Sequence, residues 1–197
     1  MLIREQYDPK IVNKESEAFA ATCVAFKIKL PEIAIASGVQ KHDIERFKVG
    51  CDDITTRDLY QILSALTPAE RTFYNSMMAI QDAAEDAGIK LPLLDLRRAA
   101  DHTDPIKAAM EMTLQVFEVQ SKTVCDKAGY ATSNFAAWFK GSRENVTLAT
   151  ISKIKSGLTR EQRAFMDAVV NAIITLYPEP SPKGVKETVS ALQLKIA

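Results

Sequence analysis

Two short stretches of the chain carry polar side chains of the kinds that hydrogen-bond to nucleic-acid bases. In the second half these are Thr132, Ser133 and Asn134, with Ala137 and Lys140 further along. An Asn amide can pair with adenine, Thr and Ser hydroxyls bond several base groups, and a Lys ammonium binds guanine or phosphate. Such contacts need one rigid element that presents the side chains together, usually a helix.

The stretch in the first half offers a different set of groups, namely Gln40, Lys41, His42 and Arg46. Gln can pair with adenine, and Arg or Lys with guanine. Asp43 lies among them, and its carboxylate repels phosphate. Both stretches are therefore candidate DNA-binding segments, but their electrostatics differ.

Other kinds of chemistry have little support in the sequence. His42 and His102 are far apart and lack partners at metal-ligand spacing, and the three cysteines show no CxxC spacing. No phosphate-binding loop, nucleophile elbow or pair of catalytic carboxylates is recognisable. We therefore expect no metal, no cofactor and no enzymatic activity. The odd number of cysteines indicates reduced thiols in a cytosol.

The two polar stretches belong to segments that follow one pattern, AIASGVQKHDIERFKVG (34–50) and CDKAGYATSNFAAWFKG (125–141). A small first residue is followed four positions later by glycine, and apolar residues stand six and nine positions after the glycine. The small residue lets two helices cross closely, and glycine takes the left-handed conformation of a short turn. The apolar residues anchor the second helix. This spacing predicts a helix-turn-helix in each segment.

The match extends over most of the chain, which indicates two copies of one domain. Apolar, glycine and arginine positions coincide at a spacing of 91 and, after residue 50, of 92. The matched pairs are Phe26/Phe117, Ile33/Val124, Gly38/Gly129, Ile44/Phe135, Phe47/Trp138, Gly50/Gly141, Ile54/Val146, Leu59/Ile151, Ile62/Ile154, Leu66/Leu158, Arg71/Arg163 and Phe73/Phe165. The polar positions have diverged, as expected of a shared core with different surfaces.

Helix-capping signals predict that both copies are helical. Asp followed by Pro, at residues 8–9 and 104–105, is typical of a helix start. TPAE at 67–70 and TREQ at 159–162 are capping boxes, and TTRD at 55–58 offers a further Thr cap. Apolar residues recur at helical spacing after these starts, and no segment shows the sustained alternation of a strand.

On these motifs, the chain resembles the Xre family of phage Cro and repressor-like DNA-binding domains. The family pattern runs from an apolar residue and Ala through Gly-Val to Ile, Trp and a closing Gly. IAIASGVQKHDIERFKVG (33–50) and VCDKAGYATSNFAAWFKG (124–141) are similar to it. The resemblance covers residues 18–80 and 108–175, and it implies that the second helix of each motif lies in the major groove.

The expected fold class is all-α, with two repeated five-helix repressor-like helix-turn-helix domains, each followed by an additional helix. The domains are predicted at residues 1–98 and 99–197. LPLLDLRRAADH (91–102) would contribute the additional helix of the first copy, and SPKGVKETVSALQLKIA (181–197) that of the second.

The resemblance also implies which residues hold phosphate beside the reading helix. In the second copy we expect Ser121, Lys122 and Arg143 to do so, together with Lys140. The family usually has a phosphate-binding Gln where this chain has Leu30 in the first copy and Ser121 in the second.

Charge distinguishes the two copies, although the formal net charge of the chain is zero. Residues 36–60 hold four basic and five acidic side chains, whereas residues 126–155 hold five basic and two acidic ones. Because phosphate contacts supply much of the affinity for DNA, copy two is predicted to be the main reader. Copy one, with Asp52 and Asp53 after its motif, either reads DNA poorly or serves another surface.

We therefore expect a sequence-specific transcriptional regulator, acting as a repressor, that binds double-stranded DNA. Two arrangements stay open: the copies form an intramolecular pseudo-dimer, or copy one joins two chains into a homodimer. The alternative function is a protein-interaction module that keeps the repressor-like fold without DNA binding. Apolar runs are short and the N-terminus lacks a signal-peptide layout, so we expect a cytoplasmic protein that does not enter a membrane.

Overall fold

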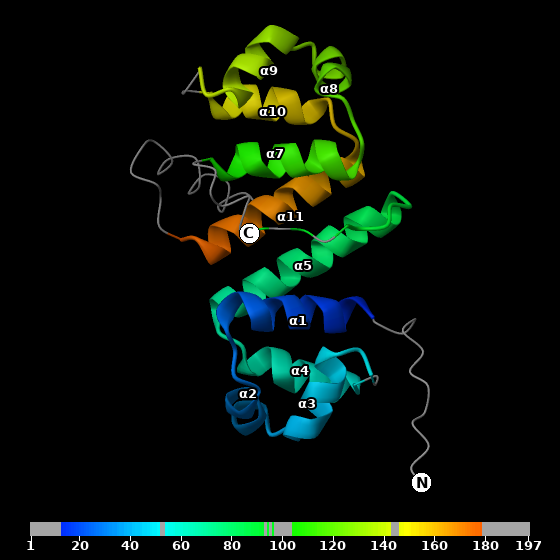
Figure 1. Ribbon diagram of the computed structural model, residues 1–197, viewed down its shortest axis with the longest axis vertical. Helices are drawn as coiled ribbons and strands as arrows, with labels where there is room; N and C mark the ends of the chain where they lie inside the picture. The colour runs from blue at the N-terminus through cyan, green and yellow to red at the C-terminus, as the bar shows by residue number, and fades with distance from the viewer. Residues whose placement is uncertain are drawn as a thin grey trace. The chain divides into compact units, whose positions relative to one another are not determined.

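The computed structural model describes residues 13–51, 54–92, 94, 96, 104–142 and 146–178. These residues form ten α-helices and contain no β-strand (Figure 1). The expectation of an all-α chain is confirmed for this part of the sequence. The chain divides into two compact units, residues 1–78 and 79–197.

The first unit is built from four helices and the start of a fifth. They are α1 (Lys14–Phe26), α2 (Leu30–Ser37), α3 (Lys41–Lys48), α4 (Thr56–Ala65) and α5 (Pro68–Asp86), of which residues up to 78 belong to this unit. Helix α2 packs against α3 and α4, and α1 packs against α3. The rings of Phe19 in α1 and Phe47 in α3 meet at 5.6 Å in a core that also buries Ile44 and Ile62.

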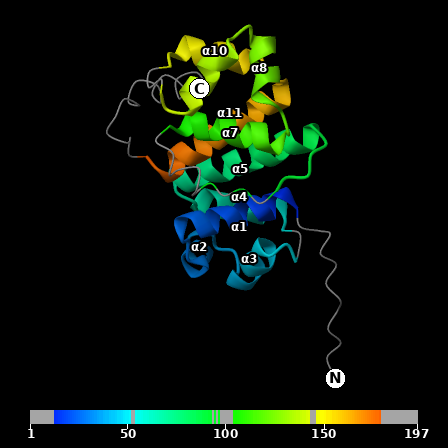
Figure 2. The ribbon, with the colours of Figure 1, turned by 45° about the horizontal axis from the view of Figure 1, so that its top comes forward.

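The second unit contains a corresponding series of five helices. They are α7 (Pro105–Val116), α8 (Ser121–Ala128), α9 (Thr132–Phe139), α10 (Leu148–Ser156) and α11 (Arg160–Leu176). Helix α7 packs along α11, and α8 contacts both α9 and α10. Figures 1 and 2 show α8 and α10 on the same side of the α7–α11 pair.

Most of the expected helix caps are confirmed. Asp104 accepts hydrogen bonds from the amides of Ile106 and Lys107 at the start of α7. The TPAE and TREQ segments both form complete capping boxes, at residues 67–70 and 159–162. The expected start at residues 8–9 lies outside the described residues, and described α1 begins after a cap formed by Asn13.

One aromatic contact recurs at matched positions of the two units. Phe26 and Phe73 meet edge to face at 5.6 Å in the first unit, and Phe117 and Phe165 do so at 5.3 Å in the second. Since these residues are paired by the sequence repeat, the end of α1 meets α5 in the same way as the residue after α7 meets α11. Assignment of either unit to the repressor-like fold stays a prediction.

Three predicted features lie wholly or partly outside the described residues. The predicted boundary between residues 98 and 99 lies within the range 97–103, and the additional helix at 181–197 also lies outside the described residues. The same holds for most of the additional helix expected at 91–102. Among the helices that are described, none combines the length and apolar character needed to span a membrane.

Candidate nucleic-acid interface

Both predicted turns are present, and both depend on a glycine with a left-handed backbone. Gly38 ends α2 with a φ of 73°, and Gly129 ends α8 with a φ of 59°. The amide of Gly38 donates to the carbonyl of Ala34, and that of Tyr130 donates to the carbonyl of Cys125. Each short helix is thereby closed, and the chain turns directly into the next helix.

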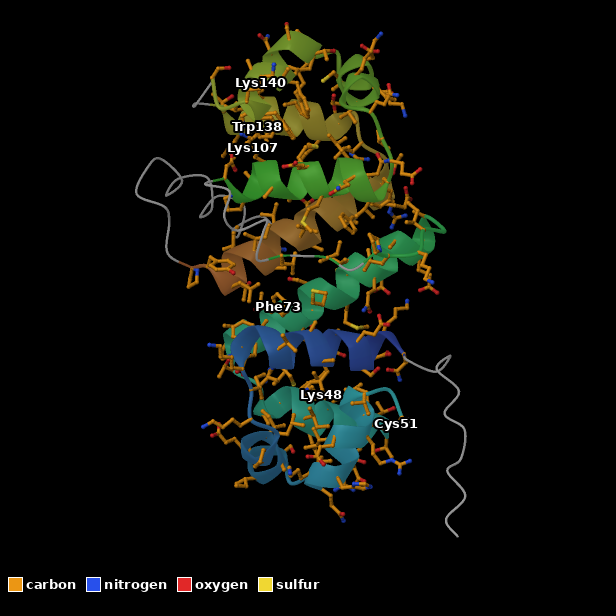
Figure 3. All side chains as sticks on the ribbon, in the orientation of Figure 1. Lys48, Cys51, Phe73, Lys107, Trp138 and Lys140 are labelled. Carbon is orange, nitrogen blue, oxygen red and sulfur yellow. The ribbon has the colours of Figure 1, made fainter. Side chains whose placement is uncertain are left out.

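Helix α9 presents the predicted reading residues in its first turn. Thr132, Ser133 and Asn134 are exposed, Ala137 is half-buried, and Lys140 is exposed immediately after the helix. Figure 3 labels Trp138 and Lys140, which lie at the C-terminal end of α9. The exposed first-turn groups and Lys140 are available for the contacts that the sequence predicts.

An aromatic cluster on α9 fixes the helix against the unit. Phe135 and Trp138 are buried, and their rings meet edge to face at 5.7 Å. Phe139 stacks on Phe135 at 4.6 Å and meets Trp138 at 5.2 Å. Burial of these rings holds the exposed face of α9 in one orientation, which direct reading of bases requires.

Helix α3 places its candidate residues in the corresponding positions, with different surroundings. Gln40 precedes the helix, and Lys41, His42 and Arg46 are exposed on it. The ammonium of Lys41 pairs with the carboxylate of Glu45 at 3.0 Å. This pairing partly neutralises a cation that was expected to contact DNA.

The first turns of the motif helices differ in charge between the units. In the first unit each helix has one acidic residue there: Glu32 in α2, Asp43 in α3 and Asp58 in α4. None of α8, α9 and α10 has an acidic residue in its first turn. The matched residues in these helices are Thr123, Asn134 and Thr150. Because a helix N-terminus carries partial positive charge, an acid there opposes binding of an external anion.

The predicted phosphate-binding residues lie around the start of α8 and the end of α9. Ser121 is half-buried at the first position of α8, and Lys122 is exposed beside it. Gln120, which precedes the helix, makes no side-chain cap, so the first amides keep their capacity to bind an anion. Arg143 lies outside the described residues, and its predicted role is untested.

Lys155, one of the basic residues counted around the second motif, forms an ion pair within its own unit. This pair was not predicted from the sequence. The ammonium of Lys155 in α10 pairs with the carboxylate of Asp167 in α11. The positive excess around the second motif is therefore smaller than its sequence suggests. The repeat contained a signal for this pair. Lys155 matches Leu63 and Asp167 matches Asn75, so the positive and the negative charge are both present in the second copy and both absent from the first.

A close contact between α8 and α10 was also missed. A Cβ atom on Gly157, just after α10, would lie 2.1 Å from the carbonyl oxygen of Val124 and 3.1 Å from the Cβ of Ala128. Only glycine permits this approach. The matched residue in the first unit is Ala65.

Two of the three cysteines, Cys23 and Cys125, are buried. Burial raises the pKa of the Cys23 thiol to about 11; the charge of Lys48 opposes this rise to a smaller extent, and the charge of Glu70 adds to it. Burial also raises the pKa of Cys125, and a hydrogen bond from the Thr132 hydroxyl opposes part of that rise. Thr132 itself is exposed at the first position of α9, so it stays with Ser133 and Asn134 among the candidates for base contacts.

No group of three or more His, Cys, Asp or Glu side chains among the described residues is arranged to hold a metal ion. No family model, curated protein or solved structure matches the chain. The resemblance to the Xre family therefore stays a prediction.

Proposed function

We propose that this chain is a sequence-specific DNA-binding transcriptional regulator, a cytoplasmic repressor whose second unit reads the major groove with α9. The observation that carries the proposal is the absence of acidic residues from the first turns of α8, α9 and α10. The same three positions of the first unit are all acidic. Helix starts without acidic residues favour the binding of phosphates, whereas acidic helix starts repel them.

Basic side chains add to the attraction of these helix ends. Lys122, Lys140 and Lys153 are exposed on α8, after α9 and on α10. Each exposed Lys that neutralises a phosphate releases counterions, so it contributes affinity without sequence preference. These residues position the unit on the duplex, and Thr132, Ser133 and Asn134 supply the sequence preference.

The proposal is tested by substituting residues of the second unit with the acidic residues found at the matched positions of the first unit. Thr123→Glu and Thr150→Asp are expected to weaken binding to all DNA sequences, because each places a carboxylate at a helix start. The measurement is fluorescence anisotropy with duplex DNA across a salt series. Gln115→Glu adds the same charge at an exposed position of α7 and serves as the control, with little expected change.

Lys140 and Asn134 separate the two kinds of contact. Lys140→Gln should weaken binding to every sequence and reduce the salt slope by about 0.9, as expected for one lost phosphate contact. Asn134→Ala should instead cost about 1–3 kcal/mol at the preferred sequence alone. The preferred sequence is obtained by selection from a random duplex library.

The second candidate function is a protein-interaction module without DNA binding. It is favoured by the first unit, which exposes the apolar side chains of Val24, Ile35, Val49 and Tyr60. If the unmodified chain binds no duplex at any salt concentration, the DNA-binding proposal is wrong and the module remains.

A further inference from the structure

The outward face of α2 is largely apolar. The matched helix α8 shows which residues occupy the same face in the second unit. Four residues of α2 are exposed: Pro31, Glu32, Ile35 and Ala36. The matched residues of α8 are exposed as well, and they are Lys122, Thr123, Asp126 and Lys127. The same four positions are thus polar in the second unit and largely apolar in the first.

Three other exposed apolar residues of the first unit show the same contrast. Val24 is 64% exposed on α1, Val49 is 61% exposed after α3, and Tyr60 is 73% exposed on α4. Their matched residues in the second unit are polar and exposed, namely Gln115, Lys140 and Ser152. The contrast therefore extends over several helices of the first unit.

Ile35 is the most exposed of these side chains, at 85%. A helix on the surface of a domain ordinarily turns its apolar residues inward and its polar ones outward. Helix α2 buries Ile33 and still carries Ile35 outward, so it is apolar on both sides. Single exposed apolar residues need no explanation, but an apolar face on a helix whose matched copy is polar indicates a partner.

We propose that the outward face of α2 is the contact through which two copies of this chain associate. The face suits a partner of its own kind because it is almost uncharged. Glu32 is its one charged residue, and its carboxylate pairs with the ammonium of Lys29 at 3.1 Å. A strongly basic or acidic partner would find no complementary charge there, whereas a second α2 brings an apolar face with its charge already paired.

The size of this face limits the strength of the association. An eight-residue helix is about 12 Å long, so two such faces bury less than the roughly 1,200 Å² of a standard interface. The dimer is accordingly weak and dissociates on dilution. If the proposed function also holds, pairing through α2 brings two α9 helices to one duplex and makes binding cooperative.

The proposal is tested with the purified full chain in the absence of DNA, so that its outcome is independent of DNA binding. Sedimentation equilibrium should show a monomer–dimer equilibrium at high protein concentration. Ile35→Asp gives α2 the residue that α8 has, and should raise the dissociation constant about tenfold to a hundredfold through lost apolar burial. Asp126→Asn, at the matched position of α8, should leave it unchanged. Ile35 is exposed, so circular dichroism should show the fold intact.

A crosslinking experiment identifies the contact surface. In a Cys51→Ser background, Ala36→Cys should form a covalent dimer with a short bismaleimide, because a two-fold axis brings the two copies of this residue together. Lys127→Cys, the matched position on α8, should not. A chain that stays monomeric up to about 1 mM, an Ile35→Asp variant that dimerises normally, or equal crosslinking at both cysteines would each overturn the proposal.

Discussion

The two units place similar apolar residues inside and different residues outside. Ile44 and Phe47 anchor α3 as Phe135 and Trp138 anchor α9, and all four are buried. On the surface, Ile35 is replaced by an Asp in the second unit, and three first-turn acids are absent there. Buried positions are constrained by packing, whereas exposed positions can change without loss of the fold. A duplicated framework can therefore acquire two surfaces with separate partners.

Polar contacts within the units differ as much as their surfaces. In the first unit the guanidinium of Arg71 donates to the carbonyls of Leu63 and Ser64 at the end of α4. In the second unit its matched residue Arg163 donates to the carbonyl of Thr159, and Lys155 pairs with Asp167 across α10 and α11. The order of helices is retained while the polar links are exchanged. Apolar packing, more than any single polar contact, accounts for the common architecture.

The largest expected effect concerns the aromatic residue that anchors the second motif. Trp138→Ala should lower the free energy of unfolding of the second unit by about 3–5 kcal/mol, because a large buried side chain is removed. Trp138→Phe gives the second unit the residue that Phe47 supplies in the first, and should cost clearly less. Urea denaturation followed by circular dichroism measures both. Equal stability of Trp138→Ala and the unmodified chain would show that the two anchors are not equivalent.

The second expected effect is a loss of stability of the first unit at alkaline pH. The folded pKa of Cys23 is about 11, above its ordinary value of 9.0. Below pH 9 the thiol is protonated in both states and its contribution is complete. Between pH 9 and 11 only the unfolded chain releases the proton, so the free energy of unfolding falls, by at most about 2–3 kcal/mol.

Tyr74 extends this loss to higher pH. Burial, with a smaller contribution from the charge of Glu15, raises the pKa of Tyr74 to about 12. Its effect begins above pH 10, so the two groups act in overlapping ranges. Cys23→Ala should flatten the stability profile between pH 9 and 11, as measured by urea denaturation at each pH. A profile that is unchanged by Cys23→Ala would rule out this thiol as the cause.

Sequence reasoning located the framework well, because its signals are local. Gly38 and Gly129 mark turns through a backbone conformation that disfavours other residues, and Thr67 and Thr159 mark helix starts through hydrogen bonds three residues away. The approach of Gly157 to Val124 could not be predicted, because it joins helices that are distant in sequence and depends on their spacing.

The third expected effect tests the close approach of α8 and α10 at Gly157. Gly157→Ala places a methyl group against the carbonyl of Val124, so α8 and α10 must move apart. Overpacking of this kind costs about 1–3 kcal/mol. Ala65→Gly is the reciprocal change in the first unit and should cost about 1 kcal/mol or less, since it only adds backbone freedom near a helix end. Urea denaturation compares them, and a harmless Gly157→Ala would mean that the close approach is not required.

The smallest expected effect concerns the ion pair that distinguishes α10 and α11 from their counterparts. Asp167→Asn alone leaves half-buried Lys155 without its partner, and should cost about 1 kcal/mol or less because both groups retain contact with water. The double variant Lys155→Leu with Asp167→Asn gives the second unit the pair Leu63 and Asn75 of the first. We expect it to recover most of the stability lost by Asp167→Asn, since an apolar side chain can replace an ion pair at a half-buried site. A double-mutant cycle that includes Lys155→Leu alone measures the coupling between the two residues. The double variant could instead lose more free energy of unfolding than the two single variants lose together. That result would show that the second unit needs a charge pair where the first does not. The two frameworks would then be less interchangeable than their buried residues indicate.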